Sequence, residues 1–138
     1  MVNMMKRNDL ERLEEEYPEV KQMTYNNIGY DYLMENSFGV SVKIEYKYRS
    51  RNIKYDITSA QVKNADIFTM RNHVGKHYHM LASTYLSLSK PHSALPSGYT
   101  GKERELSQKK FIENATTDLR ELTDQVKFRG GNLMEFMN

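Results

Sequence analysis

His73 and His77 are the residues whose spacing most resembles a metal site. Residues four apart share one face of a helix, so both imidazoles could bind the same metal ion. His79 would point elsewhere, because it lies about 200° around such a helix from His77. A third ligand would have to come from His92 or a distant carboxylate, and no HExxH arrangement supplies a general base. Histidines in such a pattern are more often partly buried and hydrogen-bonded than bound to a metal. A metal-dependent enzyme is therefore only the third functional hypothesis.

Other catalytic patterns are weaker still. The short Ser-x-x-Lys string begins at Ser87 and at Ser107, but neither copy has its companion motifs. The chain contains no cysteine, which excludes thiol catalysis, iron–sulfur clusters and zinc sites built on thiolates. Its paired carboxylates fall on predicted exposed helix faces, where nothing would separate their pKa values. We therefore predict a protein that is not an enzyme, with no catalytic residues, metal or cofactor.

A basic β-hairpin is the strongest structural pattern, and it spans residues 40–58. Apolar side chains recur at every second position, which places them on one face of paired strands. If Arg49 pairs with Asn52, Tyr46 faces Tyr55 across the hairpin. The tyrosines would then lie in the core with their apolar neighbours, and they would not form an exposed platform on which nucleic-acid bases stack.

The opposite face and the tip of this predicted hairpin are mainly basic. Such a surface could contact phosphate groups without reading bases, so nucleic-acid binding is the second functional hypothesis. The candidate phosphate contacts are Lys47, Arg49, Arg51 and Lys54.

Protein binding or assembly is the first functional hypothesis, and the C-terminal tail (residues 130–138) is its main support. The segment after Gly130 and Gly131 is apolar along one side and too short to be a stable helix alone. A loop at residues 90–99 adds apolar side chains beside two prolines, which limit its freedom and reduce the entropy lost on docking. The alternative is that the tails at residues 1–7 and 130–138 pack on their own domain. The candidate protein-binding residues are Leu133, Phe136, Met137, Leu95 and Tyr99.

The elements that would position these residues form one α+β domain over residues 1–138. A first helix is predicted from Asn8 or Asp9 to Tyr17, where Pro18 ends it. A hairpin turning at residues 26–27, followed by the 40–58 hairpin, gives a four-stranded antiparallel meander. Two antiparallel helices then cover one sheet face. The second helix of the chain is predicted over residues 64–90 and the third over residues 100–130, on either side of the 90–99 loop.

Composition sets the remaining limits. The chain has 138 residues and a formal net charge of +2, which is ordinary for one soluble domain. We expect a cytoplasmic protein that does not enter membranes, because no apolar run approaches the length of a membrane span. Its partners would be a protein or a second copy of itself, with nucleic acid as the alternative. Composition and the absence of catalytic motifs suggest a phage or mobile-element structural or inhibitor protein, found in the host cytoplasm or the virion.

Overall fold

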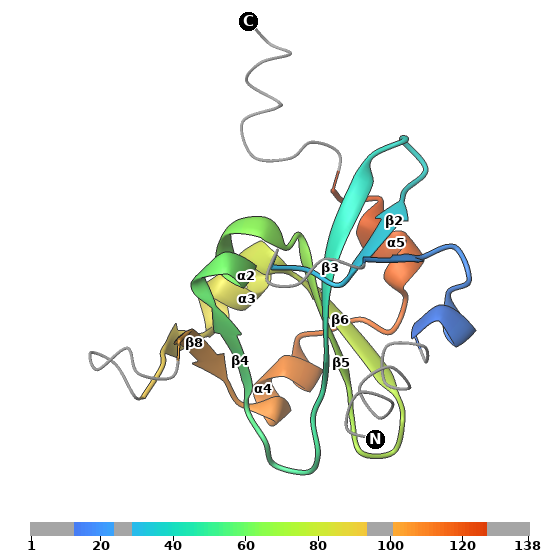
Figure 1. Cartoon of the computed structure of the whole chain (residues 1–138). Helices are drawn as coiled ribbons and strands as arrows, with labels where there is room; N and C mark the ends of the chain where they lie inside the picture. The colour runs from blue at the N-terminus through green and yellow to red at the C-terminus, as the bar shows by residue number, and fades with distance from the viewer. Residues whose placement is uncertain (1–12, 24–28, 94–100, 127–138) are drawn as a thin grey trace, which may run out of the picture.

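The computed structural model describes residues 13–23, 29–93 and 101–126. Within these ranges the chain forms an α+β fold with two β-sheets and several short helices (Figure 1). Sheet A has five strands, in the spatial order β1 (Lys21–Gln22), β2 (Tyr32–Glu35), β3 (Ser41–Tyr48), β5 (Ile67–Arg71) and β6 (His77–Leu81). Sheet B has three strands, in the order β4 (Tyr55–Thr58), β8 (Lys102–Leu106) and β7 (Lys90–Pro91).

Sheet A is a mixed sheet. Strands β3 and β5 run parallel, with Ile44 beside Ile67 and Tyr46 beside Thr69, while the other neighbours are antiparallel. A parallel pair requires a crossover connection, because the chain must return to the end of the sheet at which the first strand began. This crossover runs through β4 and helix α2 (Ser59–Asn64). The connection between two strands of sheet A therefore supplies one strand of sheet B.

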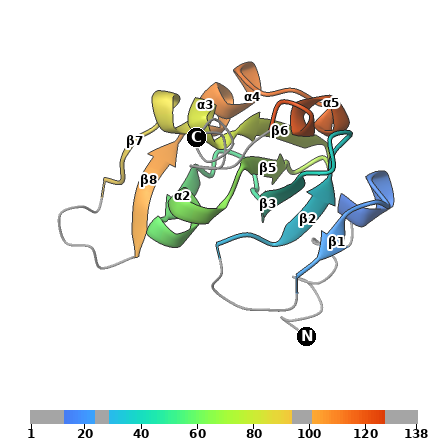
Figure 2. The same cartoon turned by 90° about the horizontal axis from the view of Figure 1, so that it is seen from above.

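The helices are short, and local capping defines where three of them begin. Helix α2 begins with a capping box in which Thr58 and Gln61 exchange side-chain to backbone hydrogen bonds. Ser107 caps α4 (Gln108–Glu113), and Asp118 caps α5 (Leu119–Thr123). Helix α3 (Ala82–Leu88) follows β6 directly. Figure 2 shows α3, α4 and α5 along one side of the molecule, where all three contact β6.

Two apolar clusters make up the core, and alternate residues of β5 contribute to each of them. Ile67 belongs to the first cluster with Val42 and Ile44, whereas Phe68 and Met70 belong to the second. All five residues of β5 are buried, as expected for a strand covered on both faces. The second cluster includes four aromatic rings in mutual contact, from Tyr55, Phe68, Tyr85 and Phe111.

The predicted 40–58 hairpin is wrong. Strand β3 pairs with β2 and β5, and β4 pairs with β8 in the other sheet. The chain turns away after Arg49, where Asn52 adopts a φ of +67°, and Ile53 is 49% exposed instead of buried. The inward direction of Val42, Ile44 and Tyr46 is correct, because these three side chains are buried. Period-two alternation fixes the faces of a strand, but it does not identify the neighbouring strand.

The four-stranded meander and the two covering helices are also wrong. Residues 64–90 contain β5, a turn, β6 and α3, and residues 102–123 contain β8, α4 and α5. At the β5–β6 turn, Asn72 Oδ1 accepts hydrogen bonds from the backbone N–H groups of Val74 and Lys76. Gly75 has a φ of +88° at this turn, so the glycine expected inside a helix marks a hairpin. Strand β7 lies within the predicted 90–99 loop, and the chain leads from it to β8 instead of to a helix.

The start of the chain agrees with the prediction as far as it is described. Residues 13–16 are helical, and Leu13 and Tyr17 are buried. Strands β1 and β2 are antiparallel, and a turn at residues 36–39 leads from β2 into β3. The predicted start of the first helix, the 1–7 tail and the turn at residues 26–27 lie outside the described residues.

Candidate functional site

Sheet B aligns charged residues across its three strands. Its register places Asp56 on β4 beside Glu105 on β8, and Glu105 beside Lys90 on β7. Side chains at directly opposite positions of neighbouring strands lie on the same face, so these three residues form one row. Additional cations come from Arg49 and Lys54, which flank the turn before β4. The row and its neighbours form the charged cluster from which the candidate site is built.

Glu105 is the centre of this cluster and is only 1% exposed. Its Oε2 lies 2.6 Å from Lys54 Nζ and 3.9 Å from Lys90 Nζ, and its Oε1 accepts a 2.8 Å hydrogen bond from the Ser93 backbone N–H. His92 Nε2 is 3.7 Å from the same Oε1. The hydrogen bond from Lys54, together with that from Ser93, lowers the pKa of Glu105 to about 2. Glu105 is therefore a buried carboxylate that remains ionised at neutral pH.

Asp56 holds the other part of the cluster. Arg49 donates to its Oδ1 at 3.0 Å, and Lys102 Nζ lies 3.6 Å from the same oxygen. His92 Nε2 is 3.5 Å from Asp56 Oδ2 and thus lies between the two carboxylates. Both ends of the β7–β8 connection, at His92 and Lys102, consequently lie against the Asp56 carboxyl group.

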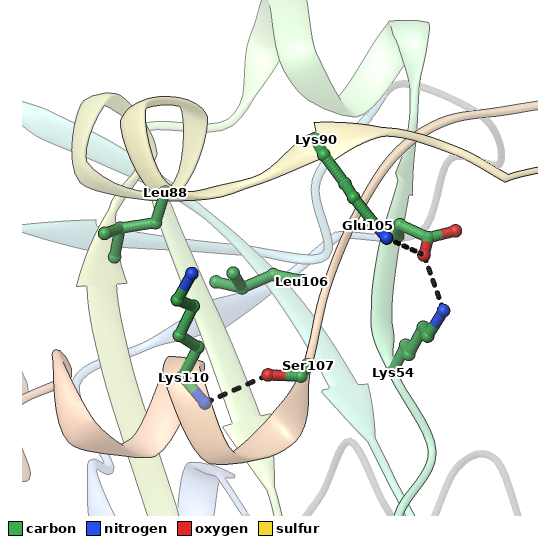
Figure 3. Close-up of a pocket in the computed structure, with 7 residues that line it drawn as sticks. All are labelled: Lys54, Leu88, Lys90, Glu105, Leu106, Ser107 and Lys110. Carbon is green, nitrogen blue, oxygen red and sulfur yellow. Dashed lines mark hydrogen bonds and ion pairs between the residues drawn. The ribbon is translucent and has the colours of Figure 1, made fainter.

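A pocket of about 270 Å³ lies beside Glu105, and we call it the lysine pocket. This volume is near the lower end for ligand sites, which begin at about 300 Å³. In Figure 3, Lys54 and Lys90 converge on Glu105, while the Lys110 side chain extends past Leu106 toward Leu88. The pocket is lined by Lys54, Leu88, Lys90, Glu105, Leu106, Ser107 and Lys110.

The lysine pocket has three ammonium groups and one carboxylate, so two positive charges are in excess. Lys54 and Lys90 share Glu105, but no carboxylate within the described ranges pairs with Lys110 Nζ. In Figure 3, Leu106 provides an apolar surface between Lys110 and Glu105, and Leu88 adds a second apolar side chain on the other side of Lys110. This arrangement can bind a small anionic group that carries an adjoining less polar part.

The four residues predicted to contact phosphate have different environments. Lys47 is largely buried and lies 3.4 Å from Glu45, and Arg49 uses its guanidinium on Asp56 and on the carbonyl groups of Tyr48 and Lys54. Arg51 is exposed in the turn before β4. Of the four, only Lys54 lines the lysine pocket.

The sequence prediction missed Lys90 and Lys110. They come from β7 and α4, which the chain brings together only through the sheet B pairing. No local spacing in the sequence connects them with Lys54. All five predicted protein-binding residues, Leu95, Tyr99, Leu133, Phe136 and Met137, lie outside the described residues.

The histidines do not have the arrangement predicted for a metal site. His73 is exposed in the β5–β6 turn, whereas His77 and His79 lie on β6. Alternate residues of a strand share a face, and the two rings lie 6.2 Å apart. The prediction that His79 points away from His77 is therefore wrong. Among the described residues, no group of three or more His, Asp or Glu side chains is arranged to hold a metal ion.

His77 and His79 instead form a buried polar layer in sheet A. His77 Nδ1 lies 2.7 Å from Glu16 Oε1, and its Nε2 lies 2.9 Å from the Tyr46 hydroxyl. His79 Nδ1 is 2.7 Å from the Thr69 hydroxyl, while its buried Nε2 has no hydrogen-bond partner within the described ranges. Burial, and secondarily the proximity of His77, lowers the pKa of His79 to about 3. His79 is therefore neutral, and both histidines contribute to the packing of the sheet.

Comparison with known proteins adds no functional information: no protein family model matches the chain, and no curated protein is similar to it. In the parts of the chain that the structure describes, no helix has the length and apolar character needed to cross a membrane.

Proposed function

We propose that the protein is a non-catalytic nucleic-acid-binding protein that contacts phosphate groups through the lysine pocket. The excess of ammonium groups over carboxylate in this pocket is the observation that carries the proposal. Lysine ammonium groups bind phosphate as point charges, and such contacts provide affinity without reading sequence. The sequence also predicts phosphate contact, through basic residues of the 40–58 segment. Of those residues, only Lys54 lines the lysine pocket.

Glu105 is compatible with this role because it holds two of the lysines in place. Lys54 and Lys90 both face its Oε2, which keeps their ammonium groups at the pocket wall. A phosphate group would then meet cations that are already positioned, so less side-chain entropy is lost on binding. Lys110 contributes a charge that no carboxylate within the described ranges neutralises.

Salt-dependent binding of oligonucleotides tests the proposal. We expect Lys110→Ala to weaken binding of a fluorescent oligonucleotide and to reduce the slope of log affinity against log salt by about 0.9. Lys110 is preferred to Lys54 or Lys90, because removing either of these would also change the surroundings of the buried Glu105.

Lys63→Ala is the matched control, because Lys63 is an exposed helical lysine that does not line the pocket. It should bind like the wild type. Absence of salt-dependent binding by the wild type would exclude nucleic acid as the partner. If Lys110→Ala and Lys63→Ala change the affinity equally, the nucleic acid does not bind at the lysine pocket.

Protein binding or assembly through the C-terminal tail is the second candidate function. It is favoured by the apolar side that Leu133, Phe136 and Met137 share after Gly130 and Gly131. The two functions use different residues, so they can be tested independently. The test of the tail compares the mass of the protein in solution with and without residues 132–138.

A further inference from the structure

Asp31 and Glu45 form a carboxyl pair inside the molecule. Asp31 precedes β2, and the β2–β3 register that pairs Tyr32 with Ile44 places it beside Glu45 of β3, which is only 5% exposed. Asp31 Oδ2 also accepts a 2.9 Å hydrogen bond from the Tyr46 backbone N–H, which fixes Asp31 beside β3. Two neighbouring carboxylates repel each other in a buried site, and one shared proton removes this repulsion.

Among the described residues, Lys47 faces the pair directly. Lys47 Nζ lies 3.4 Å from Glu45 Oε2 and is itself largely buried. One carboxylate and one neutral carboxylic acid beside Lys47 leave no net charge, whereas two carboxylates would leave one negative charge in a buried site. The charged and titratable groups around the pair come from β3 and its end, β4 and β8: Lys47, Arg49, Tyr55 and Lys102.

The environment favours the protonated form of the pair. Burial, followed by the neighbouring Asp31 charge, raises the pKa of Glu45 to about 8, and burial also raises the pKa of Asp31. Two carboxyl groups this close titrate as a unit, so the proton belongs to the pair and not to either residue alone.

The pair lies at a junction between the two sheets. The hydroxyl group of Tyr55, on β4, approaches the backbone carbonyl oxygens of Glu45 on β3 and Thr69 on β5, both at 3.2 Å. Lys47 Nζ lies 6.0 Å from the centre of the Tyr55 ring. We propose that the Asp31–Glu45 pair is a proton-binding site that makes the stability of this junction depend on pH.

The free energy of unfolding, measured against pH, tests the site. A raised pKa in the folded state means that folding takes up a proton, so stability is complete below the unfolded pKa and declines as pH rises through the folded value. The folding equilibrium constant of the wild type should fall by up to about tenfold per pH unit between about pH 5 and about pH 8. Glu45→Gln, which keeps the shape and cannot ionise, should remove most of this decline.

Glu35→Gln is the control, because Glu35 is an exposed carboxylate on the neighbouring strand β2. It should retain the wild-type pH dependence. Burial lowers the pKa of Lys47, and this effect on stability has the opposite sign, so the difference between wild type and Glu45→Gln is the quantity to compare. Equal pH slopes for wild type and Glu45→Gln would overturn the proposal.

Infrared spectroscopy provides a test that needs no folded variant. The wild type at neutral pH should show the C=O band of a protonated carboxyl group, and this band should disappear reversibly as the pH is raised through about 8. A neutral-pH spectrum with carboxylate bands alone would overturn the proposal, even if the Glu45→Gln protein did not fold.

Discussion

Glu45 and Glu105 are both buried glutamates, and their surroundings shift their pKa values in opposite directions. Glu45 faces another carboxyl group and a single lysine, and its pKa rises to about 8. Glu105 accepts hydrogen bonds from Lys54 and from a backbone N–H group, and its pKa falls to about 2. Burial favours the neutral acid, and it is the number of donors that decides whether the charged form prevails. The proposed proton site at the Asp31–Glu45 pair and the ionised Glu105 thus result from opposite surroundings of two buried glutamates.

Glu105→Gln should make the protein less stable at neutral pH by about 2 kcal/mol, because a charge-assisted hydrogen bond is lost and two lysines lose their anion. The lowered pKa gives the direction of the pH dependence. The contribution of Glu105 is present above the unfolded pKa of 4.5 and is lost as pH falls through about 2. Chemical denaturation at several acidic pH values measures the difference between wild type and variant, which should shrink toward low pH.

Glu103→Gln provides the comparison for this prediction, since Glu103 is exposed on the same strand, β8. It should change stability little at any pH. A constant difference between wild type and Glu105→Gln across the acidic range would mean that the ionised form of Glu105 does not stabilise the fold.

At the scale of elements, the sequence predicts faces better than partners. The strand within residues 40–48 and its buried residues Val42, Ile44 and Tyr46 follow from alternation, and the structure confirms them. Its pairing with β5 does not follow, because that contact joins residues on either side of a crossover. Alternation is a local property, whereas the choice of partner depends on the whole chain.

The sequence predicts a helix over residues 64–90 because apolar residues there recur at helical spacing, while the buried strands lack clear alternation. Strand β5 buries apolar residues on both faces together with the polar side chains of Thr69 and Arg71. Without alternating exposure, a short buried strand resembles a helical segment in the sequence. The turn residues Asn72 and Gly75 were the local signal that could have corrected the prediction.

The candidate site was predictable only in part. Lys54 belongs to a basic segment that is visible in the sequence, but Lys90 and Lys110 reach the pocket through the pairing of β7 with β8 and the position of α4. The carboxyl pair was equally hidden. Nothing in the sequence indicates that Asp31, before β2, meets Glu45 inside the fold.

Gly29 should be essential for placing the connection before β2 against helix α2. It has a φ of +90°, and a Cβ there would lie 2.4 Å from the backbone oxygen of Ala60. Gly29→Ala adds backbone strain and a steric overlap with main-chain atoms that cannot easily move, so we expect a loss of about 2–5 kcal/mol. Thermal or chemical unfolding measures this loss.

Gly39→Ala measures the backbone-strain part of that effect without the steric overlap. Gly39 has a similar φ of +78°, but a Cβ there would meet nothing within 4 Å. We expect a loss of only about 1–2 kcal/mol from backbone strain. If the two variants unfold alike, the close approach between Gly29 and Ala60 is not important for stability.

At the scale of the molecule, aromatic residues and the β4 crossover hold the two sheets together. After β3 the chain leaves sheet A through a turn and forms β4, which pairs with β8 in sheet B. The chain then returns through α2 to β5 in sheet A. Tyr55 on β4 packs against Phe68 on β5 and donates its hydroxyl hydrogen to sheet A. Because backbone and core both connect the sheets, we expect the described part of the chain to unfold as one cooperative unit.

The C-terminal tail is expected to contribute to assembly and not to the stability of the fold. If the C-terminal tail is a docking element, deleting residues 132–138 should leave the melting temperature nearly unchanged, because a segment this short after Gly130 and Gly131 is not a stable helix alone. If the tail binds a partner or a second copy, its apolar side chains contribute about 1.5–3 kcal/mol each before ordering costs. The deletion should then lower the mass measured in solution by light scattering or remove partner capture. A deletion that instead lowers the melting temperature strongly would assign Leu133, Phe136 and Met137 to the domain's own core and contradict the assembly hypothesis.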